Sequence, residues 1–191
     1  MQANSSIIRV NAHWNRLVFL VLLAGIAAPL TANSPWKGRA APDFKVVSGN
    51  DRVATLKQFR GQILVIMYES GDSWQKNRAL KRALLKLYNE AAPAQRLKIG
   101  RLPVIDCRKA VWPITNIYKQ KLVEHSMQEG LTIFGDWDGN LLRQLSLQSD
   151  QSNLVIIDQA GIVRYHRSGV IPAAGITAVQ NLMRQLLAGM S

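Results

Sequence analysis

The stretch GQILVIMYESGDSWQK, residues 61–76, decides how the rest of the chain is organised. It contains six consecutive apolar residues, Ile63 to Tyr68, bounded by Gly61 before them and by Gly71 after them. A short apolar run rich in β-branched residues predicts a strand that is buried on both faces. A helical pattern follows from Ala79, so the unit is a strand, a turn and a helix. In an α/β sheet ligands gather where a central strand gives way to its helix, and this turn is therefore the first place to look for function.

The residues around this strand resemble a known family. Ala41-Pro42-Asp43-Phe44, then Leu56, Phe59 and Gly61, and then the apolar strand, resemble the opening of the peroxiredoxin and thiol-disulfide oxidoreductase branch of the thioredoxin superfamily. In that branch the strand leads into a turn that carries the reactive Cys, often as Cys-x-x-Cys. The resemblance places the two Cys positions on Ser73 and Lys76, and neither residue is a thiol.

The second half of the chain extends the resemblance to about residues 38–188. Asp136 to Gly139, followed by NLVIIDQAGIV at 153–163, resembles the family's Asp-x-x-Gly turn, apolar strand and second Asp-x-x-Gly turn. In the family a cis-Pro usually precedes this strand and faces the active-site turn, and Ser152 occupies that position here. The layout is most similar to the YtfJ-type exported proteins, which are thioredoxin-like, have no settled activity and also lack the Cys pair. The resemblance implies an α/β, thioredoxin-like three-layer fold with a mixed central sheet.

The first 32 residues are expected to be a signal peptide. Two arginines precede an uncharged apolar run of 14 residues, 17–30, and residues 30–32 offer a cleavage site that ends in Ala. The run is shorter than the ~20 residues of a membrane-spanning helix, but Leu30 is bulky for a cleavage site, so an uncleaved N-terminal anchor is the alternative. Residues 33–40 are then a polar lead-in and residues 41–191 one thioredoxin-like domain. We expect export, to the periplasm if the source is a Gram-negative bacterium.

Periodicity predicts the remaining helices and strands. Helical spacing predicts helices at 78–91, 113–127 and 175–188, the second with Ile117, Leu122 and Val123 facing the core. Apolar runs predict strands at 43–47, 97–107, 131–134, 153–158 and 162–166, of which the last two form a hairpin. Residues 53–59 predict a single helical turn, and residues 141–147 fit a helix or a strand. Pro103 implies an interruption of its strand or an edge of the sheet.

Cys107 is the single cysteine, so it forms no disulfide within the chain. An exported domain normally uses cysteines in pairs. The favoured interpretation of Cys107 is a small buried side chain near the end of a strand. The alternative is a reactive thiol or half of a bridge to a second chain, because Arg108 and Lys109 beside it are expected to lower its pKa.

The charge of the chain is concentrated in one segment. The formal net charge is +12, and removal of Arg9 and Arg16 leaves +10. The segment 74–121 contains two acidic residues, Glu90 and Asp106, and twelve basic ones: Lys76, Arg78, Lys81, Arg82, Lys86, Arg96, Lys98, Arg101, Arg108, Lys109, Lys119 and Lys121. Such a field attracts anionic partners. Exported proteins seldom meet nucleic acid, so we expect an acidic envelope protein, an anionic lipid or a glycan surface; a solvated face without a dedicated partner is the alternative.

The turn at Ser73 offers little chemistry of its own. Ser73 lacks a base and an orienting residue at any recognisable spacing, so it is expected to cap the following helix instead of acting as a nucleophile. The start of that helix is a candidate anion site, with Lys76, Arg78, Arg82 and Lys86 as the candidate residues. No cofactor is expected.

Other polar and aromatic residues are expected to be structural. Asp136, Asp138 and Asn140 are interpreted as a turn with local hydrogen bonds instead of a metal site, and Trp112 and Trp137 as residues of the core.

Two functional hypotheses follow. In the first, the chain is an exported thioredoxin-fold protein without the redox Cys pair and cis-Pro, with no catalytic residue, which acts by binding an anionic ligand or partner. In the second, it is a thiol oxidoreductase or peroxidase that uses Cys107, because thiol-disulfide exchange needs a thiolate and Cys107 is the only source of one.

Overall fold

The computed structural model describes residues 34–190, and the predicted signal segment lies outside them. Residues 33–191 form one compact unit. Its strands are β1 (Lys45–Ser48), β2 (Val53–Thr55), β3 (Ile63–Glu69), β4 (Ile99–Asp106), β5 (Phe134–Asp136), β6 (Asn153–Ile157) and β7 (Val163–Ser168). Its helices are the 3₁₀ helix η1 (Leu56–Phe59) and the α-helices α1 (Arg78–Glu90), α2 (Pro93–Arg96), α3 (Thr115–Glu129), α4 (Asn140–Gln144) and α5 (Ala173–Ala188).

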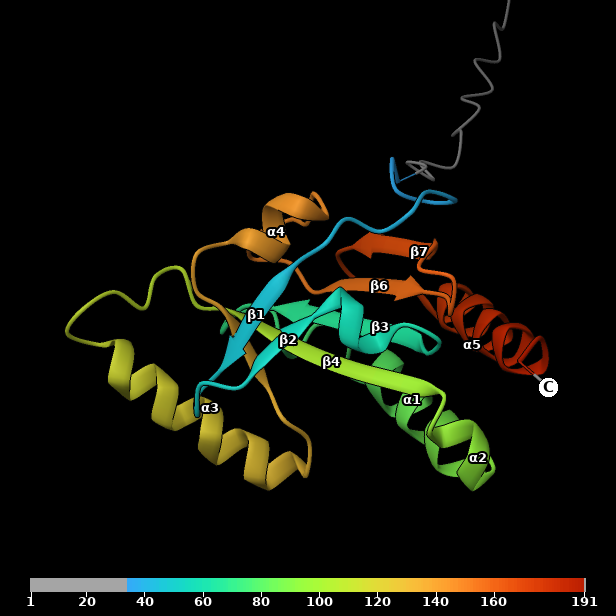
Figure 1. Ribbon diagram of the computed structural model, residues 1–191, viewed down its shortest axis with the longest axis horizontal. Helices are drawn as coiled ribbons and strands as arrows, with labels where there is room; N and C mark the ends of the chain where they lie inside the picture. Colours follow the sequence, from blue (N-terminus) through green and yellow to red (C-terminus); the bar gives the residue numbers. More distant parts are fainter. Residues whose placement is uncertain (1–33, 191) are drawn as a thin grey trace, which may run out of the picture. The chain divides into compact units, whose positions relative to one another are not determined.

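The described strands form one mixed sheet with the order β2-β1-β5-β4-β3-β6-β7 (Figure 1). The central strands β3, β4 and β5 are parallel, whereas β6 is antiparallel to β3 and pairs with β7 as a hairpin. The predicted central strand is confirmed, and it has a hydrogen-bonded neighbour on both sides. The expected α/β fold with a mixed sheet is therefore present.

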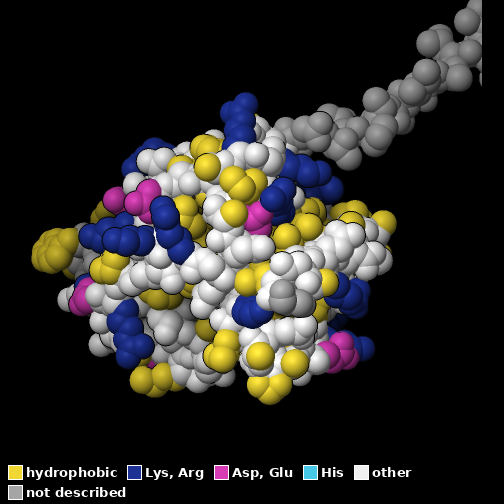
Figure 2. Space-filling view, turned by 45° about the vertical axis from the view of Figure 1, so that its right-hand side comes forward, with side chains coloured by type: hydrophobic (Ala, Val, Ile, Leu, Met, Phe, Trp, Pro, Cys, Tyr) yellow, Lys and Arg dark blue, Asp and Glu magenta, His cyan; other side chains and the backbone are white. Residues whose placement is uncertain are grey.

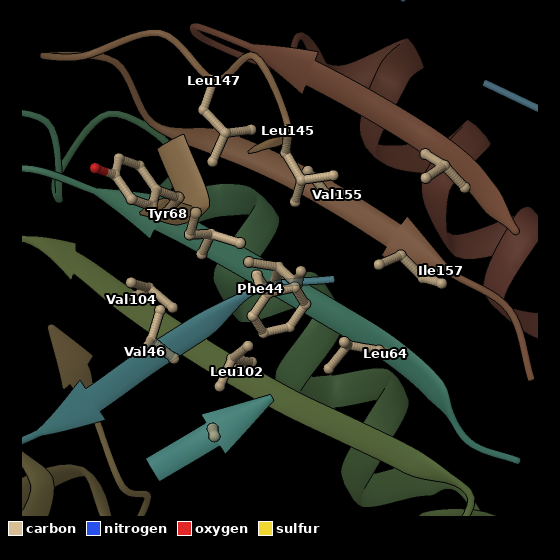
Figure 3. Close-up of a cluster of buried hydrophobic side chains, with 14 residues drawn as sticks. Phe44, Val46, Leu64, Tyr68, Leu102, Val104, Leu145, Leu147, Val155 and Ile157 are labelled. Carbon is tan, nitrogen blue, oxygen red and sulfur yellow. The ribbon is translucent and has the colours of Figure 1, made fainter. Parts of the chain in front are cut away.

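Alternate residues of β3 face two different cores, which gives the fold its three layers. Leu64, Ile66 and Tyr68 point into a cluster closed by Phe44 and by residues of and after α4 (Figure 3). Ile63 and Val65 point to the other face, where leucines of α1 and Val179 and Met183 of α5 cover them. Figure 1 shows α4 on one side of the sheet and α1, α2 and α3 on the other. Because both faces are covered, a continuous apolar run is what this strand requires.

A third, smaller core lies beneath α3. Cys107, Ala110 and Leu122 are buried there, with Tyr118 and Trp137 packed against them. The Trp137 indole Nε1–H donates to the carbonyl of Val47 at 2.8 Å, which ties this cluster to β1. The prediction that Trp137 belongs to the core is confirmed. Among the described residues, no helix is long and apolar enough to cross a membrane.

Several element boundaries differ from the sequence predictions. The first strand starts at Lys45 and the fifth starts at Phe134, each later than predicted. Residues 53–59 are a short strand followed by a 3₁₀ turn, because residues 53–55 pair with β1. In the stretch 141–147, which fitted a helix or a strand, residues 141–144 belong to helix α4, and Pro93 starts the additional short helix α2. Of these elements, β5 pairs with the distant strand β1, whereas β2 and α2 have partners nearby in the sequence.

Pro103 lies inside a continuous strand, so the predicted interruption is wrong. It pairs with Met67 of β3, and the ladder to β5 begins only at Val104. Pro103 therefore has no partner residue in β5. Because proline lacks an N–H, its position beyond the end of β5 costs the sheet no hydrogen bond on that side. An inner strand can behave locally as an edge when its neighbour is short.

The N-terminal part of α3 is more exposed than the sequence pattern predicted. Leu122 is buried as expected, but Ile117 is 52% exposed and does not reach the core. Trp112, also expected in the core, is 87% exposed in the loop before the helix. Both predictions are wrong, because the small cluster beneath α3 is already filled by Cys107, Ala110, Tyr118 and Trp137.

Candidate functional site

Ser73 lies in the turn between β3 and α1 and is fully buried. Its Oγ accepts a hydrogen bond from the backbone N–H of Ser70 at 2.7 Å and another from the Ser70 hydroxyl at 3.1 Å. It does not cap α1, which begins at Arg78 with Asn77 at the N-cap position. The predicted cap is therefore wrong. Ser73 lies five residues before the first residue of α1, and its hydroxyl bonds Ser70 at the start of the turn instead.

Asn77 connects this turn to two other loops. Its Nδ2 donates to Ser152 Oγ at 3.0 Å and to the Gly169 carbonyl at 2.9 Å, and its Oδ1 accepts from the Ile171 N–H at 2.9 Å. The Ser152 hydroxyl donates in turn to Glu69 Oε1 at 2.8 Å. Asn77, Ser152 and Glu69 are buried, so each bond replaces one that water would make in the unfolded chain. We call residues 69–77, Ser152 and their partners the corner.

The buried carboxylate of Glu69 is neutralised by a lysine of α1. Lys81 Nζ lies 2.8 Å from Glu69 Oε2, donates to the Trp74 carbonyl, and sits 5.9 Å from the centre of the Trp74 ring. A buried carboxylate is tolerable when its oxygens are both bonded and its charge is balanced. Sequence analysis missed Glu69, Asn77 and Lys81; the acidic residue at the end of the apolar run was the available signal.

Lys76 binds a neighbouring loop. Its Nζ donates to the Asp150 carbonyl at 2.9 Å and to Gln151 Oε1 at 3.1 Å. The resemblance assigned redox chemistry to the positions of Ser73, Lys76 and Ser152, and Asn77 of the same turn bonds Ser152. The three positions offer two hydroxyls and an ammonium group, and none can form the thiolate that disulfide exchange requires.

The other anion-binding candidates lie on the solvent side of α1. The side chains of Arg78 and Arg82 are exposed, and no hydrogen bond or ion pair of either side chain is found within the described region. Lys86 lies 3.7 Å from Glu90, both largely exposed. An anion site at these residues stays a prediction.

The basic segment 74–121 does not form one patch in space. It runs through α1, α2, β4 and the start of α3, and Figure 1 shows α2 and the loop before α3 at opposite ends of the molecule. Figure 2 shows lysine and arginine side chains distributed over one face, with apolar side chains between them. Charge that is concentrated in the sequence is thus divided among separate surfaces.

Cys107 is buried against α3, in the third core cluster. Burial, followed by the negative charges of Asp106 and Asp136, raises the pKa of its thiol to about 12. The expectation that Arg108 lowers this pKa is wrong, because Arg108 turns away to bind Asp106 with both ends of its guanidinium, at 2.8 and 2.6 Å. At neutral pH almost no thiolate forms at this position.

The acidic residues near Cys107 have structural partners. Asp136 is buried, and its carboxylate accepts the N–H groups of Leu141 and Leu142 at the start of α4. Asp138 Oδ1 accepts the N–H of Asn140 at 2.9 Å, as expected for a turn. Burial raises the pKa of Tyr68 far above its ordinary value, with Asp136 and Asp106 adding to the rise. Across residues 34–190, no group of three side chains has the arrangement of a metal site.

Two shallow pockets lie away from the corner. One of ≈330 Å³ lies at the opposite end of β3, between η1 and the turn 158–161, and is lined by Leu56, Phe59 and Arg60 among others. The other, of ≈240 Å³, lies between the C-terminal half of α3 and the β1–β2 turn. Neither is lined by a residue of the corner.

The corner lies at the end of the central strand β3, and residues 69–77 and Ser152 contain no sulfur atom. No protein-family profile matches the chain, and no curated protein matches it. Among solved structures, similarity extends to the exposed lipoprotein thioredoxin Etrx1 of Streptococcus pneumoniae (16% identity, 76% of this chain, 100% of that chain, TM-score 0.53). The thioredoxin domain of a thiol-disulfide oxidoreductase from Bacteroides vulgatus is similar too (13% identity, 77% and 97%, TM-score 0.55).

A thiol peroxidase from Chromobacterium violaceum is a third similar structure (14% identity, 79% of this chain and 87% of that chain, TM-score 0.54). At such identities the likeness concerns the fold alone. The thioredoxin-like fold is therefore shown.

Proposed function

We propose that this protein is a redox-inactive thioredoxin-fold protein that acts by binding an anionic partner. The observation that carries the proposal is the corner itself, where Ser73, Lys76 and Ser152 are all committed to hydrogen bonds within the protein. A network of this kind holds loops together and leaves no group for electron exchange. The positive charge of the surface is then the main feature through which the protein can bind a partner.

We also propose a type for this protein and a location in the cell. The sequence layout is most similar to that of the YtfJ-type exported proteins, so we propose that type, and the expected signal segment would bring the domain to the cell envelope. There an acidic envelope protein, an anionic lipid or a glycan is the kind of partner that a chain of net charge +12 attracts. The predicted anion-binding residues of α1, Arg78 and Arg82, are exposed and available to such a partner.

Retention on an anionic surface tests the binding part of the proposal. We expect retention of the protein on a sulfated-glycan resin, weakened by salt because the charges are exposed. The double variant Arg78→Gln/Arg82→Gln should elute at lower salt. A matched variant, Lys57→Gln/Arg60→Gln in and directly after η1, removes two exposed charges outside the basic segment and should elute nearly as the parent does. Retention that ignores salt would overturn the electrostatic basis.

Catalytic assays test the alternative, a thiol oxidoreductase or peroxidase that uses Cys107. The named activities of the similar structures favour it, whereas the raised pKa of the buried thiol opposes it. We expect no catalytic reduction of a disulfide or a hydroperoxide, and the same result with Cys107→Ala. Turnover that Cys107→Ala abolishes would establish the alternative and refute the proposal.

A further inference from the structure

The loop between β4 and α3 exposes a continuous run of apolar residues. Val111 is 65% exposed and Trp112 is 87% exposed, and Pro113 and Ile114 are exposed as well. One helical turn later Ile117 is also exposed. Isolated apolar residues on a surface are normal, but four in succession mark a site of interaction unless the chain itself covers them. We call residues 111–117 the wedge.

The wedge is held in place at its base. Ala110 is buried beside Cys107, and its N–H donates to the Cys107 carbonyl at 2.9 Å. The Thr115 hydroxyl donates to the Ala110 carbonyl at 2.8 Å, and the Ile114 N–H donates to the Val111 carbonyl at 2.9 Å. Figure 1 shows this loop projecting from the body of the domain. The apolar side chains are therefore presented on a preorganised projection.

Positive charge surrounds the wedge. From Cys107 to Val123 the chain has four basic residues, Arg108, Lys109, Lys119 and Lys121, and no acidic one. Arg108 is paired with Asp106, Lys119 with Asp51 at 2.6 Å, and Lys109 only loosely with Asp150, at 4.0 Å. Lys76 reaches the same Asp150 loop. These five cations face three acids, so the surroundings of the wedge remain cationic.

Lys121 extends the wedge along α3. Ile114, Ile117 and Lys121 are spaced three and four residues apart and therefore follow one side of the helix. Glu124 begins the next turn, farther from the projecting loop. A side that is apolar at its tip and basic behind it suits a boundary between hydrocarbon and anionic head groups, where tryptophan is also favoured.

We infer that the wedge docks the protein onto an anionic lipid bilayer, with Trp112, Val111 and Ile114 in the interface and Lys109 and Lys121 at the head groups. This inference rests on the proposed function and names its partner. The wedge projects from the domain (Figure 1), and neither pocket described above includes one of its residues, so it suits a deformable surface better than a peptide ligand. Lysines near such a surface are attracted to its anionic head groups.

Vesicle binding tests the inference with the chain 33–191, which forms its own compact unit and excludes the apolar run 17–30. The vesicles contain either equal parts of phosphatidylglycerol and phosphatidylcholine or phosphatidylcholine alone. We expect binding to the anionic vesicles and quenching of tryptophan emission by brominated phospholipid. The double variant Trp112→Ser/Ile117→Ser should bind about tenfold more weakly and lose the quenching. Both residues are exposed, so the variant should fold.

Leu97→Ser is the matched control, because Leu97 is 79% exposed at the other end of β4 and should leave vesicle binding unchanged. Equal binding by the parent and the wedge variant, or no quenching in the parent, overturns the inference. If the parent is still retained on the sulfated glycan in a salt-sensitive manner, the proposed function survives that result. If retention on the glycan fails as well, both fall. Binding only to an acidic protein would also overturn docking to lipid.

Discussion

Asn77 makes more connections than any other side chain in the corner. It makes three hydrogen bonds to two other loops, whose bonded residues lie 75–94 residues from it along the chain. Both the NH₂ group and the carbonyl oxygen of its amide are used, and a hydroxyl or a carboxylate at this position could not donate two hydrogen bonds and accept a third. The corner therefore depends on an amide side chain that no sequence motif singled out.

Replacement of Asn77 should destabilise the protein strongly. Asn77→Ala leaves the Ile171 N–H and the Gly169 carbonyl without their partner, and the expected loss in the free energy of unfolding is about 2–4 kcal/mol. Urea denaturation measures it. The matched variant Asn89→Ala, at an exposed position of α1, should change this free energy by less than about 0.5 kcal/mol. Equal effects of the two variants would contradict the role given to the network.

At the scale of elements, α4 and β7 are joined by a histidine. His166 of β7 lies with its Nε2 2.8 Å from the carbonyl of Leu145, which follows α4. Because a carbonyl only accepts, Nε2 carries the proton. Burial lowers the pKa of His166 below its ordinary value, although the bond to Leu145 opposes that change.

The lowered pKa of His166 makes stability depend on pH. As pH falls through about 6.5, the unfolded chain takes up a proton on this residue before the folded chain does, so the free energy of unfolding decreases. We expect a smaller decrease between about pH 7.5 and pH 5.5 in His166→Gln, whose side chain keeps a donor but does not titrate. His125→Gln, at an exposed position of α3, should behave as the parent does. Identical curves for all three proteins would refute this assignment.

At the scale of the whole molecule, stability comes from cores that lie within residues 34–190. The two faces of the sheet and the space beneath α3 are filled by three clusters from this part of the chain. The single cysteine is free, so no internal disulfide contributes. The domain must therefore be held by packing and by the hydrogen bonds of its corner.

Deletion of residues 1–32 should leave this stability intact. Residues 33–191 form a compact unit of their own, so the free energy of unfolding should change by less than about 0.5 kcal/mol. Urea denaturation of the full chain and of the shortened chain makes the comparison. A loss of several kcal/mol would mean that the deleted residues pack on the domain. The result also decides whether chain 33–191 is suitable for the vesicle experiment.

The sequence by itself determined the central strand and the general architecture. An unbroken apolar run is sufficient to indicate a strand covered on both sides, and β3 occupies residues 63–69 against a prediction of 63–68. The resemblance also singled out Ser73 and Ser152; Asn77, four residues after Ser73, bonds Ser152, and a chemical role for these positions stays a prediction. Local periodicity and motif spacing carry this information, because they record which residues share a face.

Only the tertiary structure decided what each of these residues meets. The neighbours of Cys107 in the sequence are basic, yet burial and the carboxylates of Asp106 and Asp136 raise its pKa. Trp112 and Ile117 fit an inward pattern, yet other side chains already fill the space beneath α3. Burial and charge act through space, so the surroundings of a side chain depend on segments that its local sequence does not specify.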